Sequence, residues 1–527
     1  MEESLLLLGL LAVTIALGAL AKRFELPYPI VFVIGGGLLA FAPGLPAIHI
    51  RPELLFLVVL PPLLYAGGWT TDWVEFRRNL RPIGLLAVGL VVTTTVIVAA
   101  AAHAITPELG WASAFALGAV VSPPDAVAAE AVFERFDVPR RILVILSGEG
   151  LVNDATALVI YRFAIVAAMT GAFSLANAAG TFVVVAAGGV AMGFAAGAAI
   201  VAFGKLLEKH MIADALLDNL TLLLAPYAAY LLADSLHVSG VLSAVTAGIY
   251  VSRKSSSIYS PETRLTGYAI WEILIFLFNA LVFLLIGLEV REIVRSPDFA
   301  LHYLWAGIAV SVIAIVVRIL WVFPATYLPR ALSRSVREND PSPPWQWVFV
   351  ISWSGMRGIV SLAAALALPY TADGKPFPGR DEIVFITFCV IFSTLVLQGL
   401  SLIPIVRRLG LGGNDDLKEK ETEVRIAALR AGLAKLHDLE SGFGSVEEWE
   451  VQGRSVAEYE YRIAHLLGHA AGDRPEAYES RIDHRLQTEA LQAERDEIMR
   501  LRSAGEIPDE IFRLVEYDLD LADSRLR

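Results

Sequence analysis

Long apolar segments recur along the chain from the N-terminus to about residue 408 and then stop. A helix needs roughly 20 apolar residues to cross a bilayer, and charged or Pro- and Gly-rich breaks divide this region into segments of about that length. The pattern predicts an all-α polytopic membrane protein of about 13 transmembrane helices. We expect these helices at about 4–21, 28–42, 52–68, 82–104, 112–133, 142–170, 177–205, 214–233, 238–251, 268–290, 303–328, 345–369 and 380–407.

Two of these segments are interrupted near their centres. Segment 112–133 contains Ser122-Pro123-Pro124-Asp125, and its two prolines remove backbone donors and clash with the preceding turn. Segment 345–369 contains Ser354-Gly355-Met356-Arg357-Gly358 at similar depth. Irregular backbone at membrane depth is tolerated where it is buried in protein or lines a watery cavity. We therefore expect two discontinuous helices; simple proline kinks and a glycine packing notch are the alternative.

The two interrupted segments are separated by an odd number of spans, so they cross the membrane in opposite directions. Opposed, broken helices are typical of inverted repeats in secondary transporters, whose ion sites lie at the midplane between the breaks. The sequence therefore predicts an inverted repeat with a site between Asp125 and Arg357.

The distribution of basic residues predicts the orientation, because Lys and Arg accumulate in cytoplasmic loops. Connections after even-numbered segments carry five such residues, whereas connections after odd-numbered segments carry sixteen. We therefore expect the N-terminus outside and the C-terminal tail in the cytoplasm, with the first apolar run retained as a span. The sixteen are Lys22, Arg23, Arg77, Arg78, Arg81, Arg135, Arg140, Arg141, Lys205, Lys209, Arg253, Lys254, Arg264, Arg330, Arg334 and Arg337.

Composition supports this division into a membrane part and a tail. Hydrophobic residues make up 56% of the chain and charged residues 18%. Residues 411–527 hold 27 acidic and 16 basic residues, so they account for −11 of the net charge of −12. We predict a transmembrane domain over 1–410 and an acidic cytoplasmic helical domain over 411–527. The lack of a basic stripe argues against nucleic acid as a partner, and the single cysteine, Cys389, excludes an intrachain disulfide.

Charged residues on three predicted spans fall at one depth. Asp154 follows the cytoplasmic end of its helix by about twelve residues, or roughly 18 Å, and Asp125 and Arg357 lie at comparable depth. Charges inside a membrane are costly and mark functional sites by default. We therefore place the candidate site at this level.

Helical geometry separates two roles within Gly148-Glu149-Gly150-Leu151-Val152-Asn153-Asp154. Glu149 and Asn153 share a helix face, while Asp154 is rotated by about 100° from Asn153. A buried guanidinium needs a carboxylate partner, so we predict a scaffold ion pair of Glu149 with Arg357, held by Asn153. We expect Arg318 and Arg162 to pair with backbone carbonyls or acids as scaffold. Asp154 would then face a cavity without a permanent counter-charge.

A carboxylate at Asp154 can bind a proton or a cation, but not both, because both compete for the same oxygens. Burial disfavours the charged form, so we predict that this competition drives exchange. Asp125 has two possible roles, either as a further cation ligand or as a counter-charge to the positive N-terminal ends of the half-helices. Asn153, next to Asp154, and the oxygens freed at Ser122, Pro123 and Pro124 are further candidate ligands.

At these residues the chain resembles the first branch of the monovalent cation/proton antiporter superfamily, which includes bacterial Na⁺/H⁺ exchangers and the animal plasma-membrane exchangers. The resemblance covers roughly residues 5–408 and rests on four motifs. These are residues 122–127, 148–154, 283–288 and 353–358. It implies a homodimer, a core domain that moves against a dimerisation domain, Asp154 as the carrier, a Glu149–Arg357 pair, and electroneutral exchange of one cation per proton. The resemblance thus implies a secondary transporter of the plasma membrane with no cofactor.

The chain departs from the family pattern at two places. Many relatives have Thr-Asp-Pro where this chain has Pro124-Asp125-Ala126, and many have Ser where this chain has Gly150. Both differences remove a hydroxyl near the predicted site, so K⁺ and Li⁺ stay open beside Na⁺ as the transported ion.

Two other classes of protein are weighed against an antiporter. Aspartyl intramembrane proteases use Tyr-Asp and Gly-x-Gly-Asp in spans, whereas here Tyr517-Asp518 and Gly472-Asp473 fall in the tail. A passive cation channel needs a continuous pore lined by carbonyls or acids, whereas this chain offers an isolated acid between two breaks. We therefore favour antiport.

Overall fold

The computed structural model divides into two compact units, residues 1–413 and 414–527. It describes residues 2–42, 55–133, 136, 138–171, 174–209, 214–255, 257–291, 301–372, 375–411, 415–439 and 446–471, and a few residues between 493 and 521. Arg135, which contributed to the predicted orientation, lies outside the described residues, as do Gly472-Asp473 and Tyr517-Asp518.

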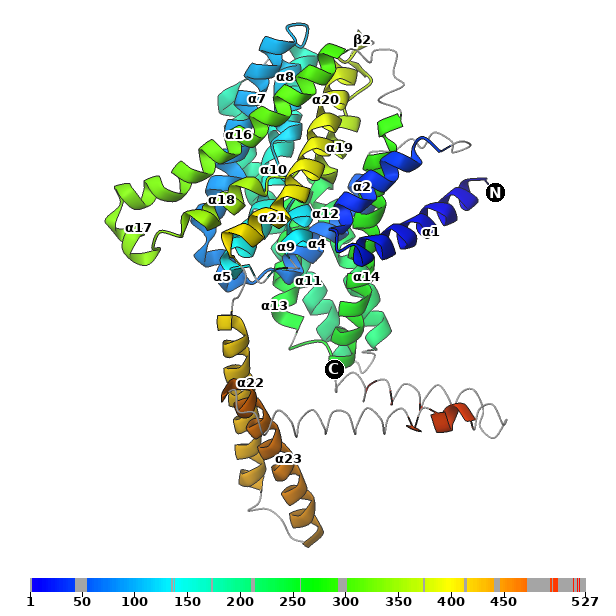
Figure 1. The fold of residues 1–527 in the computed structure, drawn as a ribbon, viewed down its shortest axis with the longest axis vertical. Helices are drawn as coiled ribbons and strands as arrows, with labels where there is room; N and C mark the ends of the chain where they lie inside the picture. Colours follow the sequence, from blue (N-terminus) through cyan, green and yellow to red (C-terminus); the bar gives the residue numbers. More distant parts are fainter. Residues whose placement is uncertain are drawn as a thin grey trace. The chain divides into compact units, whose positions relative to one another are not determined.

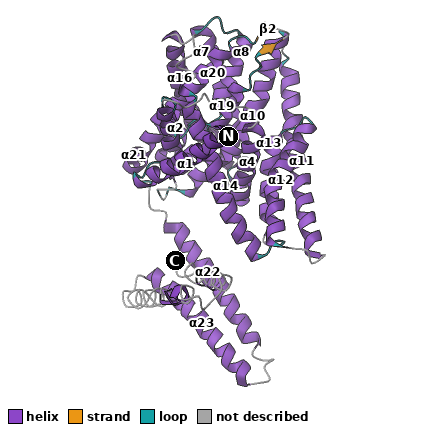
Figure 2. Ribbon diagram, turned by 90° about the vertical axis from the view of Figure 1, so that its right-hand side faces the viewer, coloured by secondary structure: helices purple, strands orange, loops and turns teal. Residues whose placement is uncertain are grey.

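The first unit is a bundle of helices, as predicted (Figure 1). Figure 2 shows long helices of this bundle running side by side. Each predicted apolar segment falls on one helix or on consecutive helical pieces. The helices are α1 (Glu2–Arg23), α2 (Tyr28–Leu39), α4 (Leu60–Thr70), α5 (Trp73–Arg78), α6 (Leu80–Gly84), α7 (Val91–Ile105), α8 (Trp111–Val121), α9 (Ala126–Phe133), α10 (Arg140–Thr170), α11 (Leu175–Lys209), α12 (Ala215–Ser235), α13 (Gly240–Ser255), α14 (Pro261–Leu288), α16 (Leu301–Leu332), α17 (Arg334–Asn339), α18 (Trp345–Trp353), α19 (Ile359–Leu366), α20 (Arg380–Ser393) and α21 (Gly399–Leu409).

Several spans combine an α-helix with a short π-helical piece. These pieces are η1 (Leu55–Val59), η2 (Leu85–Leu90) and η3 (Thr394–Gln398), and a two-stranded ribbon of β1 (Thr371–Ala372) and β2 (Lys375–Pro376) joins α19 to α20. Among the described residues, eight helical stretches are long and apolar enough to cross a membrane, and the shorter Tyr28–Leu39 and Leu55–Thr70 are also apolar. The chain is thus a multi-pass helical membrane protein.

Both predicted helix breaks are present. α8 ends at Val121 and α9 begins at Ala126, while α18 ends at Trp353 and α19 begins at Ile359. Pro123 and Pro124 cannot donate to the preceding turn, which ends α8. The two breaks touch, because the backbone N–H of Asp125 donates to the carbonyl of Met356 at 2.6 Å. This contact joins segments more than 200 residues apart in sequence at the centre of the unit.

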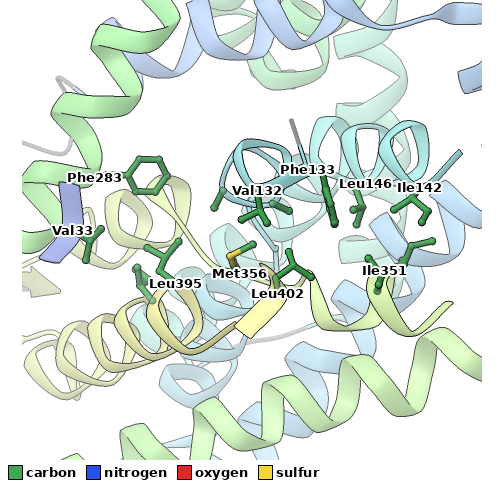
Figure 3. Close-up of a cluster of buried hydrophobic side chains, with 14 of the residues drawn as sticks. Val33, Val132, Phe133, Ile142, Leu146, Phe283, Ile351, Met356, Leu395 and Leu402 are labelled. Carbon is green, nitrogen blue, oxygen red and sulfur yellow. The ribbon is translucent and has the colours of Figure 1, made fainter. Parts of the chain in front are cut away.

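The largest apolar core surrounds these breaks (Figure 3). Met356, within the second break, is fully buried between Leu395 and Leu402 on one side and Val132 on the other. On this side of the breaks, burial keeps water from the freed backbone groups, which then depend on protein partners.

Small residues let neighbouring helices approach closely, as is common in membranes. A Cβ added at Gly36 of α2 would lie 2.3 Å from the carbonyl oxygen of Leu284 in α14. A Cβ at Gly287 of α14 would likewise lie 2.2 Å from the carbonyl oxygen of Val33. Larger residues at these two positions would therefore force α2 and α14 apart.

At one end of the bundle, a carboxylate joins four segments of the chain. Asp340 follows α17 and accepts hydrogen bonds from Arg141 at 2.6 Å, from Arg330 at 2.8 Å and from Arg81. These arginines lie at the start of α10, near the end of α16 and in α6. The cluster ties the ends of these helices together.

The described part of the second unit is a pair of helices, α22 (Asp415–Leu439) and α23 (Val446–Ala471). A Cβ at Gly432 would lie 2.6 Å from the Tyr459 ring, and the Gln452 amide donates to the carbonyl of Leu436 at 3.0 Å. These contacts make the pair antiparallel. The acidic helical domain expected over 411–527 stays a prediction.

Candidate functional site

Asn153 on α10 contacts the first helix break, between α8 and α9. Asn153 is fully buried, and its side-chain N–H donates to the carbonyl of Pro124 at 2.8 Å. That carbonyl is one of the groups freed by the break between α8 and α9. Asn153 therefore steadies the first break, and the prediction that it holds an arginine–glutamate pair is wrong. Its side-chain oxygen, buried beside the break, has no hydrogen-bond partner among the described residues.

The Asp125 carboxylate lies at the N-terminal ends of two half-helices. It accepts hydrogen bonds from the backbone N–H groups of Val127, at 2.9 Å, and Ala128 in the first turns of α9. It also accepts one from Ile359, the first residue of α19. The first residues of a helix leave N–H groups unsatisfied and carry partial positive charge. The geometry therefore favours the second predicted role of Asp125, as counter-charge to both half-helices.

Gly358 makes room for this arrangement. A Cβ on Gly358 would lie 1.6 Å from Oδ2 of Asp125, which is far too close for two non-bonded atoms. The carboxylate therefore occupies the space that any other side chain at position 358 would fill. Sequence reasoning noted the glycine as part of the break but missed this packing requirement.

Asp154 faces a cavity of about 400 Å³. Its exposed fraction is 8%, and among the described residues none donates a hydrogen bond or a salt bridge to its carboxylate. Asp125, Pro123, Pro124 and Gly150 line the same cavity. The structure thus brings Asp154 beside the first break with its oxygens available to a ligand.

Glu149 pairs with Arg318, which corrects the predicted Glu149–Arg357 pair. Two guanidinium nitrogens of Arg318 donate to the two carboxylate oxygens of Glu149 at 2.5 and 2.8 Å. Both residues are at most 1% exposed. The sequence predicted that Arg318 pairs with carbonyls or acids, and it does both, since it also donates to the carbonyl of Ile351 at 3.1 Å.

Arg357 binds backbone carbonyls. Its Nε donates to the carbonyl of Val121 at 3.0 Å, and another guanidinium nitrogen donates to the carbonyl of Gly355. Its backbone N–H donates to Thr394 in η3 at 3.1 Å. Val121 is the last residue of α8, so Arg357 satisfies carbonyls at both breaks. The sequence placed Arg357 at the correct level but could not show which of two buried arginines reaches Glu149.

Ser122 turns away from the cavity. Its hydroxyl donates to the carbonyl of Ala119 at 3.1 Å within its own helix, and it is 1% exposed. Pro123 and Pro124 do line the cavity, although the carbonyl of Pro124 is already bonded to Asn153. The geometry therefore offers a cation the oxygens of Asp154 first, since Asn153 is not among the described residues that line the cavity.

The two departures from the family pattern face one another. A Cβ on Gly150 would lie 2.7 Å from the Cβ of Ala126 at the start of α9. The absence of a side chain at position 150 therefore sets how closely α9 approaches α10. The sequence does not show this contact, because Gly150 and Ala126 are distant along the chain.

Known proteins similar to this chain are sodium/hydrogen exchangers and antiporters. Residues 9–408 match the family model described as "Sodium/hydrogen exchanger, transmembrane". The chain is 35% identical over 448 residues to a protein of Bacillus pumilus (strain SAFR-032) named a sodium, potassium, lithium and rubidium/H⁺ antiporter, covering 83% of this chain but 66% of that protein. It is also 30% identical over 524 residues to an uncharacterised Na⁺/H⁺ exchanger of Escherichia coli (strain K12), covering 95% and 94% of the two chains.

Among solved structures, the sodium proton antiporter MjNhaP1 of Methanocaldococcus jannaschii matches with a TM-score of 0.56. The match covers 76% of this chain and 100% of that chain at 17% sequence identity. At this identity the likeness concerns the fold.

Proposed function

Because this chain belongs to the transmembrane sodium/hydrogen exchanger family, we propose that it is a secondary antiporter that exchanges protons for Na⁺ or another monovalent cation at Asp154. The observation that carries the proposal is the Asp154 carboxylate, nearly buried, beside a helix break, and facing a cavity without a counter-charge. An acid in this position binds one positive ligand at a time. A transporter of this kind needs no cofactor and is not an enzyme.

The residues around Asp154 have separate roles in this proposal. The buried, unpartnered oxygen of Asn153 lies on the adjacent residue and is a second candidate ligand, although Asn153 is not among the described residues that line the cavity. Asp125 holds the ends of α9 and α19 in place, and Arg318–Glu149 and Arg357 hold the helices around them. Because Asp154 lines the cavity with no hydrogen-bond partner among the described residues, we take it as the single carrier, which supports exchange of one cation for one proton.

The transported ion is Na⁺ in this proposal, with K⁺ and Li⁺ as competitors. The name of the Bacillus pumilus relative includes all three ions. Carboxylate and amide oxygens are hard ligands that accept any of them. The described residues place no cage of carbonyl oxygens around Asp154, which gives little reason for strict selection.

The proposal extends to the membrane and the assembly. We place the chain in the plasma membrane with its N-terminus outside and the C-terminal unit in the cytoplasm, on the distribution of basic residues. A homodimer with a moving core domain is what the family resemblance implies.

Purified protein in liposomes tests the function. A preformed pH gradient should collapse when Na⁺, K⁺ or Li⁺ is added on one side, and Asp154→Asn should abolish this while the protein still assembles. The matched control is Asp234→Asn, an exposed acid on α12. A cation flux that persists without proton movement would favour a passive channel, and normal exchange by Asp154→Asn would refute the assigned carrier.

A further inference from the structure

A second cavity, of about 860 Å³, adjoins the one at Asp154. The two cavities share part of their lining, including Gly67 and Thr70 of α4, Glu130 of α9 and Asn279 of α14. Asp154 and Asp125 line only the first of the two, so these shared residues lie where one cavity passes into the other.

The second cavity extends toward the face that carries the basic connections. Its lining includes Tyr28 at the start of α2, Thr70 at the end of α4 and Tyr268 in the second turn of α14. These helix ends adjoin Lys22 and Arg23, Arg77 and Arg78, and Arg253 and Lys254 respectively. Glu130, which lines both cavities, therefore lies between this face and Asp154.

Glu130 lies nearer this face than the residues of the site. It follows Asp125 by five residues on α9, about 7.5 Å along the helix. Its carboxylate accepts a hydrogen bond from the hydroxyl of Ser147, which precedes Asp154 by seven residues on α10, about 10 Å. Glu130 and Ser147 therefore form a polar pair about two turns from the carrier, on the path to it.

The chemistry of this junction suits a hydrated or partly hydrated monovalent cation. Glu130 supplies a charged carboxylate, and Ser147 and Asn279 supply neutral oxygens. The Thr70 hydroxyl donates its proton to the carbonyl of Ala66 at 3.0 Å. The lone pairs of the hydroxyl oxygen can still accept. Leucines and Phe283 make up much of the remaining wall of the inner cavity, and Glu272 is a further carboxylate along the wall of the second cavity.

We propose that Glu130, together with Ser147, Thr70 and Asn279, forms an entry site that binds the transported cation between the basic face and Asp154. The inference rests on the proposed function and deepens it, because it assigns a second, transient cation site to the same route. The simpler interpretation is that the Glu130–Ser147 hydrogen bond ties α9 to α10. The two interpretations predict different kinetics. Loss of an entry site changes the KM for the cation at one face of the membrane, whereas loss of a structural bond changes transport from both faces.

The test compares the two faces in vesicles of known orientation. For Glu130→Gln we expect the KM for Na⁺ at the basic face to rise about five- to tenfold, as for the loss of one charged ligand. The KM at the opposite face and the maximal rate should stay within about twofold. Glu130→Asp keeps the charge and should recover most of the affinity. Asn279→Ala should shift the KM at the same face in the same direction.

Controls separate this inference from the proposed function. Glu262→Gln removes an exposed acid at the first turn of α14, outside both cavities, and should leave both KM values unchanged. An equal change of KM at both faces, or no change at either, would overturn the entry site. Exchange by the native chain would still support the proposed antiport. If Glu130→Gln does not assemble, an unchanged KM in Asn279→Ala would overturn it. Absence of exchange in the native chain would instead reject the function itself.

Discussion

At the scale of single residues, the position of the Asp125 carboxylate depends on an absent side chain. Its Oδ2 lies where a Cβ of residue 358 would stand, and from there it reaches the first turns of both α9 and α19. Gly358 is required here because a Cβ at this position would overlap the carboxylate. Its contribution is space.

Gly358→Ala should therefore displace Asp125 and reduce exchange by at least tenfold, because about 1.4 kcal/mol of lost capping suffices for that factor. Gly84→Ala in α6 is the matched control, since a Cβ there meets nothing within 4 Å. Transport rates and protein yield of the two variants should be measured together. Native exchange by a well-folded Gly358→Ala protein would contradict the packing argument.

The pair of Arg318 and Glu149 is a second residue-scale feature. Removing one partner of a buried pair leaves an uncompensated charge and costs about 3–5 kcal/mol. Arg318→Met alone should thus lower the yield and melting temperature of the protein in detergent. The double variant Glu149→Leu/Arg318→Met should recover most of the loss, because an apolar replacement of both charges is often neutral. Additive losses would show that the pair is not coupled.

At the scale of elements, Asp340 links helix ends that are distant in sequence. Burial raises the pKa of its carboxyl, but the hydrogen bonds and charges of Arg141 and Arg330 outweigh this and hold the pKa below its usual 3.8. A depressed pKa means that the folded state favours the charged form. The resulting stability is present above pH 3.8 and is lost as the pH falls through the lower, folded-state value.

Melting temperatures measured against pH test this link. The native protein should lose stability below about pH 4, whereas Asp340→Asn should be less stable at neutral pH and should show a flatter acid dependence. Asp381→Asn, whose side chain is 70% exposed beside Arg380, is the control for a generic lost carboxylate. Parallel curves for the native protein and Asp340→Asn would argue against the link.

At the scale of the whole molecule, the sequence predicted the helical bundle and both breaks because these depend on local signals. Pro123 and Pro124 end a helix whatever surrounds them, and apolar length defines a span. The partner of Glu149 depended on which of two arginines, in α16 or after α18, approaches α10 from the correct side. Spacing along one helix holds no information about that, so Arg357 was assigned wrongly. The contact of Gly150 with Ala126 was hidden for the same reason.

Charge balance gives a prediction for the complete transport cycle. If Asp154 is the one titrating carrier and Asp125 keeps its charge as a cap, a cycle moves one cation against one proton and no net charge. The exchange rate in liposomes should then be unaffected by an imposed membrane potential across the range of about 100 mV, over which one net charge would gain about 2.3 kcal/mol. A rate that follows the potential would refute this stoichiometry.

The contact of the two helix breaks also has a mechanical consequence. Met356 accepts from the backbone of Asp125, and the Asp125 side chain accepts from both half-helices. Separating α9 from α19 would leave several buried N–H groups and a carbonyl unpaired at once, each at a cost of about 1–3 kcal/mol. The crossing is therefore a stiff joint rather than a hinge. Any displacement that exposes Asp154 to the other side would move α9, α10 and α19 together, and the sliding surface would be the opposite cavity wall of α4 and α14.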